Sequence, residues 1–134
     1  MVRDFIRASL YDPASGYFAS RPASVGTLPS PLDFRSMRGL GEYQKSLAGH
    51  YARLGCAWLT PSELFQPMYG AALAAYVLKA AEEDGSLQGG LRVIEVGPGT
   101  GTAARDFMLH VRGAAPGVFG SMTYTLVRRG DREE

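Results

Sequence analysis

A run of seven residues, Glu95 to Gly101, has the composition of a ligand-binding turn. It reads Glu-Val-Gly-Pro-Gly-Thr-Gly. Glycine lets the backbone turn sharply and approach a bound molecule closely, because no Cβ intervenes. If a helix begins directly after the turn, its first N–H groups have no acceptor within the helix and can face a polar ligand. We therefore favour a ligand-binding turn over a tight turn with a purely structural role.

Two common nucleotide-binding patterns do not fit this run. A P-loop needs Gly-Lys followed by Ser or Thr, and no such sequence follows the turn. The dinucleotide-binding fingerprint needs Gly or Ala at the position that Thr102 occupies. An NAD(P)-dependent oxidoreductase therefore remains a disfavoured alternative, supported only by the generic order of the neighbouring elements.

The residues around the turn predict a strand before it and a helix after it. Leu91 to Val96 is a short apolar run typical of parallel strands that are buried on both faces. A helix is expected over 101–112, ending near Gly113, and a second strand over 122–127. These elements form a βαβ unit with a right-handed crossover. Ligands of open α/β sheets lie beyond the carboxyl ends of the strands, where this turn is expected.

Upstream of residue 60 the sequence predicts helices and loops. Apolar residues at helical spacing predict a helix over 2–10 and a second one from Tyr43 to Leu54. Between them, residues 20–41 are rich in Ser, Pro, Gly and Arg, which is typical of a loop.

A further helix start lies at Thr60-Pro61-Ser62-Glu63. Thr60 can cap the helix, Pro61 suits its first position, and Glu63 can complete a capping box. Pro67 predicts a kink or a restart of the helix. Beyond it, we expect an apolar stripe that faces the core and includes Met68, Tyr69, Leu73 and Tyr76.

Composition excludes several classes of function. The 134 residues hold 14 basic and 13 acidic side chains, so the net charge of +1 argues against a nucleic-acid binder. With 46% hydrophobic and 20% charged residues the chain is globular. No apolar run is long enough to span a membrane, and residues 1–13 lack the apolar segment of a secretory signal. The single cysteine, Cys56, excludes an intramolecular disulfide, and His50 and His110 lack partners for a metal site.

Three signatures, in the same order along the chain, resemble those of one methyltransferase family. The first covers residues 5–18, with Phe5-Ile6-Arg7 and Gly16-Tyr17-Phe18; the second covers residues 58–65, with Thr60-Pro61-Ser62-Glu63; the third covers residues 94–102, with the glycine turn. The turn itself resembles the first motif of class I S-adenosylmethionine-dependent methyltransferases. Together the signatures resemble the MidA-like family of mitochondrial complex I assembly arginine methyltransferases.

This resemblance implies an α/β fold. A helical N-terminal region would precede the first βαβ unit of a Rossmann-like class I methyltransferase. We accordingly expect a helical extension over 1–88, a partial methyltransferase domain over 89–127 and a charged tail over 128–134. Members of the family continue well beyond the second strand, so we expect a truncated domain with an incomplete sheet.

The resemblance also implies a cofactor and a substrate. S-Adenosyl-L-methionine would be bound by residues of the turn, namely Glu95, Gly97, Pro98, Gly99, Thr100 and Gly101, with Glu95 helping to place its amino-acid end. The substrate would be an arginine of a protein, a subunit of respiratory complex I, in the mitochondrion. Glu63 is a candidate site carboxylate and Thr60 a candidate ligand contact, although helix capping is the simpler interpretation of both. No catalytic residue is assigned, and neither a metal nor a nucleic-acid partner is expected.

One departure from the family leaves an alternative open. In the MidA-like family, the second strand ends in an acidic residue that holds the ribose hydroxyls of the cofactor, as in dinucleotide-binding folds. Here Arg128 follows Val127, and a guanidinium offers only hydrogen-bond donors. The predicted function is therefore a protein arginine N-methyltransferase in complex I assembly, in an active or an inactive truncated form. The alternative is a non-catalytic interaction or regulatory fragment of such an enzyme.

Overall fold

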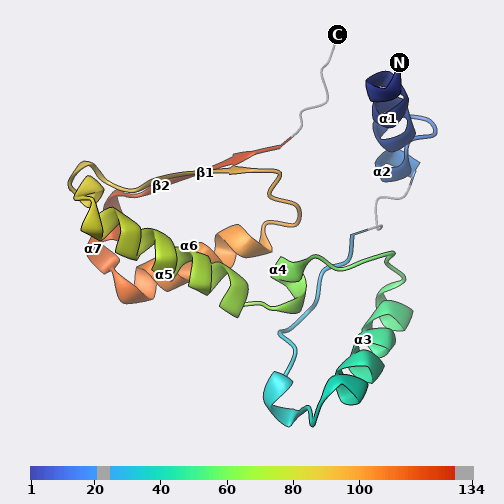
Figure 1. The fold of residues 1–134 in the computed structure, drawn as a ribbon, viewed down its shortest axis with the longest axis horizontal. Helices are drawn as coiled ribbons and strands as arrows, with labels where there is room; N and C mark the ends of the chain where they lie inside the picture. Colours follow the sequence, from blue (N-terminus) through green and yellow to red (C-terminus); the bar gives the residue numbers. More distant parts are fainter. Residues whose placement is uncertain (21–24, 129–134) are drawn as a thin grey trace. The chain divides into compact units, whose positions relative to one another are not determined.

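The computed structural model describes residues 1–20 and 25–128 (Figure 1). The chain divides into two compact units. The first comprises Met1–Pro29 and Asp33–Thr60, and the second comprises Ser30–Leu32 and the chain from Pro61 onward. The packing division therefore falls after Thr60, earlier than the predicted start of the methyltransferase domain at residue 89, whose assignment stays a prediction.

The first compact unit is helical. Its longer helices are α1 (Val2–Tyr11) and α3 (Leu40–Leu54), which confirm the two helices predicted from apolar spacing. Gly55, with a φ of 61°, ends α3. The intervening stretch is mostly loop, as predicted, apart from two short segments, and residues 21–24 lie outside the described part. These segments are α2 (Tyr17–Ser20) and the 3-10 turn η1 (Phe34–Ser36).

The second compact unit holds the remaining elements. In chain order they are α4 (Pro61–Leu64), α5 (Met68–Glu83), η2 (Ser86–Gly89), β1 (Arg92–Val96), α6 (Thr102–Ala114), α7 (Pro116–Ser121) and β2 (Thr123–Val127). Pro67 separates α4 from α5, so the predicted restart is confirmed. The short helix α7 is not among the elements predicted from the sequence. Its sequence signal is Pro116, which occupies the first helical position.

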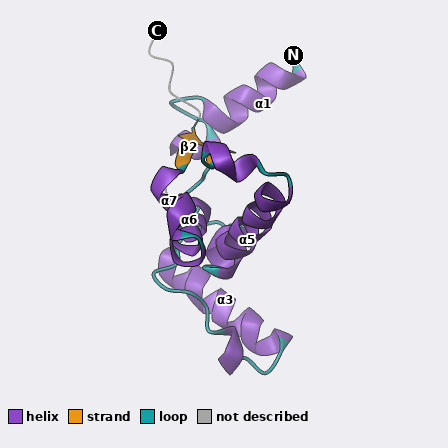
Figure 2. Ribbon diagram, turned by 90° about the vertical axis from the view of Figure 1, so that its left-hand side faces the viewer, coloured by secondary structure: helices purple, strands orange, loops and turns teal. Residues whose placement is uncertain are grey.

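The two strands pair in parallel, with Arg92 opposite Thr123 and Val96 opposite Val127. Because α6 and α7 lie between them in the chain, the predicted strand–helix–strand order is confirmed. Figures 1 and 2 show α5 and α6 side by side, and Figure 1 shows the helices α5, α6 and α7 on one side of the sheet. The structure of this unit is thus a mixed helix and strand arrangement built on a two-stranded parallel sheet.

The prediction that β1 is buried on both faces is wrong. Ile94 is 68% exposed and Val96 79% exposed. Val93 and Glu95, which point to the opposite face, are partly buried. Among the described residues, helices cover only that second face of the sheet.

The predicted core stripe of α5 is also wrong. Met68, Tyr69, Leu73 and Tyr76 are all exposed. The buried residues of α5 are Gly70, Ala74 and Ala81, which are all small. They let α5 approach α6 closely, while Val77 and Leu78 of the same helix are partly buried and pack against the core. The core cluster of buried residues consists of Ala74, Leu91, Phe107 and Val111.

Of the helices described here, none combines the length and the apolar character that crossing a bilayer requires.

Candidate functional site

The glycine turn lies where the sequence predicts it, between the end of β1 and the start of α6. Gly97, Gly99 and Gly101 have φ values of 75°, 55° and 83°. Residues with a Cβ rarely adopt positive φ values, so the backbone path of the turn depends on glycine. Two backbone hydrogen bonds hold it: Gly97 donates to the carbonyl of Val127 at 3.0 Å, and Gly101 to that of Pro98 at 2.8 Å.

The turn faces open space. A Cβ placed on any of its three glycines would meet no atom of the described residues within 4 Å beyond its own neighbours in the chain. The carbonyl of Gly101 accepts the N–H of Arg105 at 3.0 Å, so the first turn of α6 begins directly after the glycines. The N–H groups of that turn have no intrahelical acceptor, and the helix dipole is positive there. A polar or anionic group can therefore approach this backbone.

Glu95 lies next to the turn, on the face of the sheet that the helices cover. Its Oε2 accepts a hydrogen bond from the hydroxyl of Tyr124 on β2 at 3.0 Å. Burial raises the pKa of Tyr124 to about 12, and the hydrogen bond and negative charge of Glu95 add to the rise. The neighbouring strand thus holds one oxygen of the carboxylate in place.

This pair predicts a loss of stability at alkaline pH. The pKa of Tyr124 lies above the ordinary value of 10.0, at about 12. The folded state therefore keeps the phenol proton at pH values where the unfolded chain has lost it. The stabilisation is complete below pH 10 and decreases as the pH rises toward 12.

Ultraviolet absorbance of the phenolates during a pH titration measures this effect. We expect Tyr124 to contribute a component that titrates late, and Tyr124→Phe to remove it. Tyr76→Phe, at an exposed position, is the matched control and should keep it. A late component that survives in Tyr124→Phe would contradict the assignment.

Glu63, the candidate carboxylate of α4, is brought to the turn. Its side chain is fully buried, at 0% exposure. Its Oε1 accepts hydrogen bonds from the hydroxyl of Thr100, at 2.7 Å, and from the hydroxyl of Thr102. Capping of its own helix does not account for these bonds. Thr60 directly precedes α4 and belongs to the other compact unit, so its ligand contact stays a prediction.

Sequence reasoning missed three residues that extend this polar cluster. Gln66 is buried and donates through Nε2 to the backbone carbonyl of Glu63 at 3.2 Å. Its Oε1 accepts from Nη2 of Arg105 at 2.7 Å, and Arg105 also pairs with buried Asp106 at 2.8 Å. The available signal was spacing, because Thr102 and Asp106 lie four residues apart on α6 and Gln66 follows Glu63 by three residues.

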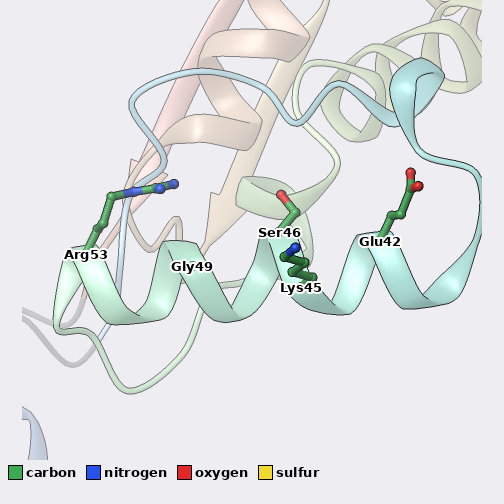
Figure 3. Close-up of a pocket in the computed structure, with 5 residues that line it drawn as sticks. All are labelled: Glu42, Lys45, Ser46, Gly49 and Arg53. Carbon is green, nitrogen blue, oxygen red and sulfur yellow. The ribbon is translucent and has the colours of Figure 1, made fainter.

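Other parts of the described structure offer weaker candidates for a binding site. A shallow hollow lies along α3 and is lined by Glu42, Lys45, Ser46, Gly49 and Arg53. Figure 3 shows Glu42 and Arg53 toward opposite ends of this row, with Lys45 and Ser46 between them. These side chains come from one helix and do not converge. Within residues 1–20 and 25–128, His, Cys, Asp and Glu form no group that could hold a metal ion.

Comparison with known proteins bears on the turn directly. Residues 72–131 match the model of a family described as "Putative S-adenosyl-L-methionine-dependent methyltransferase". The cofactor is S-adenosyl-L-methionine. The matched segment holds most of α5, both strands, the glycine turn and α6. No curated protein and no solved structure matches the chain.

The residues of the turn fit S-adenosyl-L-methionine. The cofactor carries a carboxylate, which suits the N–H groups at the start of α6, and the glycines leave room for its approach. The two-stranded parallel sheet is compatible with part of a methyltransferase fold. The match begins at residue 72, so two of the three MidA-like signatures, at residues 5–18 and 58–65, lie before it.

Proposed function

We propose that this chain carries the cofactor-binding part of a MidA-like, S-adenosyl-L-methionine-dependent protein arginine N-methyltransferase. Its role would be in the assembly of respiratory complex I in the mitochondrion. The observation that carries the proposal is the open glycine turn between β1 and α6, within the segment that matches the methyltransferase family. The signatures at residues 5–18 and 58–65 support the narrower MidA-like assignment.

Different residues of the turn would bind different groups of the cofactor. Gly97, Gly99 and Gly101 let the backbone pass close to the methionine part of the cofactor, and the first N–H groups of α6 would receive its carboxylate. Glu95 would accept from its ammonium group, because a carboxylate can accept several hydrogen bonds and Tyr124 uses one. The bound cofactor supplies a methyl group on a positively charged sulfur. The chain contributes orientation and exclusion of water.

An arginine substrate sets a further requirement. Its guanidinium stays protonated at neutral pH and has no free lone pair, so a carboxylate must orient it and accept a proton. Glu63 is a buried carboxylate beside the turn, but its Oε1 already accepts hydrogen bonds from Thr100 and Thr102. The proposal therefore assigns no catalytic residue among those described.

The position of Arg128 favours a second candidate function. Arg128 directly follows β2 and is exposed. It stands where the family has an acidic residue for the ribose hydroxyls, and it cannot accept their hydrogen bonds. The second candidate is thus a non-catalytic fragment that interacts with or regulates such an enzyme.

Calorimetric titration with S-adenosylhomocysteine separates these candidates. We expect saturable heat with the wild-type chain and at least about tenfold weaker binding to Gly99→Arg. The added side chain would occupy the open space of the turn, at a φ of 55° that disfavours it. Gly85→Arg is the matched control, because Gly85 also has a positive φ, 74°, and open space around it but lies outside the turn.

Equal heats from the wild type and Gly99→Arg would contradict the cofactor site. Absence of heat from the wild type would favour the non-catalytic fragment. Transfer of a labelled methyl group from S-adenosyl-L-methionine to arginine in a complex I preparation would exclude that fragment and support the arginine substrate.

A further inference from the structure

We propose that Glu63 is a positioning residue for the cofactor turn. Its buried carboxylate holds the end of the turn, from Thr100 to Thr102, in the shape that binds the cofactor. The inference rests on the proposed function of the turn and goes beyond it, because α4 lies outside the segment that matches the methyltransferase family. Figure 1 shows α4 beside the start of α6.

The hydroxyls of Thr100 and Thr102 converge on the Glu63 carboxylate. Both donate to the same oxygen, Oε1 of Glu63, and they lie 3.2 Å from each other. The residue between them is Gly101, whose φ is 83°. One carboxylate oxygen thus holds the chain on both sides of Gly101. Hydrogen bonds to an ionised acceptor are stronger than those between neutral groups.

The Glu63 carboxylate is itself held by neighbouring side chains. A buried carboxylate destabilises a fold unless hydrogen bonds or charges compensate it. Oε2 of Glu63 lies 3.4 Å from the Nε2 donor of Gln66, and Gln66 in turn accepts from Arg105 on α6. The positive end of α6 adds favourable electrostatics. Hydrogen bonds therefore connect the Glu63 carboxylate of α4 to Thr102 directly and to Arg105 through Gln66, both on the first turns of α6.

The Glu63 hydrogen bonds lie apart from the hydrophobic core. The core cluster of Ala74, Leu91, Phe107 and Val111 does not include Glu63 or either threonine. Loss of the Glu63 bonds should therefore loosen the turn more than the core. Val111, at 0% exposure, provides a core position whose truncation lowers stability without touching the turn.

The test compares four single variants of the full chain. Thr102→Val removes the hydroxyl at nearly constant shape, Thr102→Ser keeps it, Glu63→Gln removes the charge, and Val111→Ala weakens only the core. We expect Thr102→Val and Glu63→Gln to bind S-adenosylhomocysteine about tenfold more weakly by calorimetry. Thr102→Ser should restore the affinity lost in Thr102→Val. Val111→Ala should lower the unfolding temperature with little change in affinity.

Hydrogen exchange of the peptide that covers residues 97–104 gives a readout independent of the ligand. We expect faster exchange there in Glu63→Gln and Thr102→Val than in Val111→Ala. Wild-type affinity in both Thr102→Val and Glu63→Gln would overturn the proposal. Losses of affinity that merely follow the fall in unfolding temperature would also overturn it. If the wild type binds no S-adenosylhomocysteine, the proposed function fails, and the exchange comparison alone then supports or overturns the positioning role. If Glu63→Gln does not fold, the Thr102 pair decides.

Discussion

Replacing Gly70 by valine is expected to destabilise the second compact unit by about 3 kcal/mol or more. A Cβ at this position of α5 would lie 2.7 Å from the backbone oxygen of Ala103 and 2.9 Å from the backbone nitrogen of Phe107. Both atoms belong to the backbone of α6, which cannot move aside as a flexible side chain can. The two helices would have to separate, and the close contact between them would be lost.

Thermal unfolding followed by circular dichroism measures this effect as a lower midpoint. The matched control is Gly113→Ala, because Gly113 lies in α6 and a Cβ there meets no atom within 4 Å. Alanine at an open helical position should leave stability unchanged or raise it by about 0.5–1 kcal/mol. A Gly70→Val chain as stable as the wild type would contradict the close approach of α5 and α6.

Phe107→Ala is expected to cost about 3–5 kcal/mol, a large part of the stability of a small domain. Phe107 is buried in the core cluster. Its ring also meets that of Tyr124 edge to face, with centroids 5.4 Å apart. This one side chain therefore joins α6 to β2, and its loss leaves a cavity between helix and sheet.

Urea denaturation compares this variant with Leu109→Ala on the same helix. Leu109 is 46% exposed, so its truncation should cost less than about 1 kcal/mol. We expect the midpoint to fall far more in Phe107→Ala than in the control. Equal shifts in the two variants would show that the face of α6 toward the sheet does not carry the core.

The turn and its flanking elements could be predicted because their signals are local. The three glycines occupy alternate positions from Gly97 to Gly101, and they directly follow the apolar run of β1. The helices α1 and α3 could likewise be predicted from apolar residues at a helical period. Such signals depend on neighbours in the chain and need no knowledge of distant contacts.

Burial could not be predicted in the same way, because it depends on distant contacts. The helix α5 has large apolar side chains, such as Met68 and Tyr76, as well as small ones such as Gly70 and Ala74. Hydropathy favours the large residues as the core. The close approach of α6 instead selects the small ones. For β1, alternate apolar residues suit burial on either face, and the position of the helices decides which face is covered.

Glu63 shows the same limit for the site. Its sequence context indicates a helix start, and that signal is local. Its hydrogen bonds reach Thr100 and Thr102, which are far along the chain, and no spacing rule connects them. The sequence could therefore name Glu63 as a candidate carboxylate but could not identify its partners.

The bond from Gly97 to Val127 has a consequence for biosynthesis. One of the two backbone hydrogen bonds that hold the glycine turn needs a carbonyl at the far end of β2, which the ribosome adds only after the turn, α6 and α7 have been made. Until β2 emerges and pairs with β1, the N–H of Gly97 lacks its acceptor. We therefore expect the turn to reach its final shape only after β2 has been translated, although its own residues are made earlier.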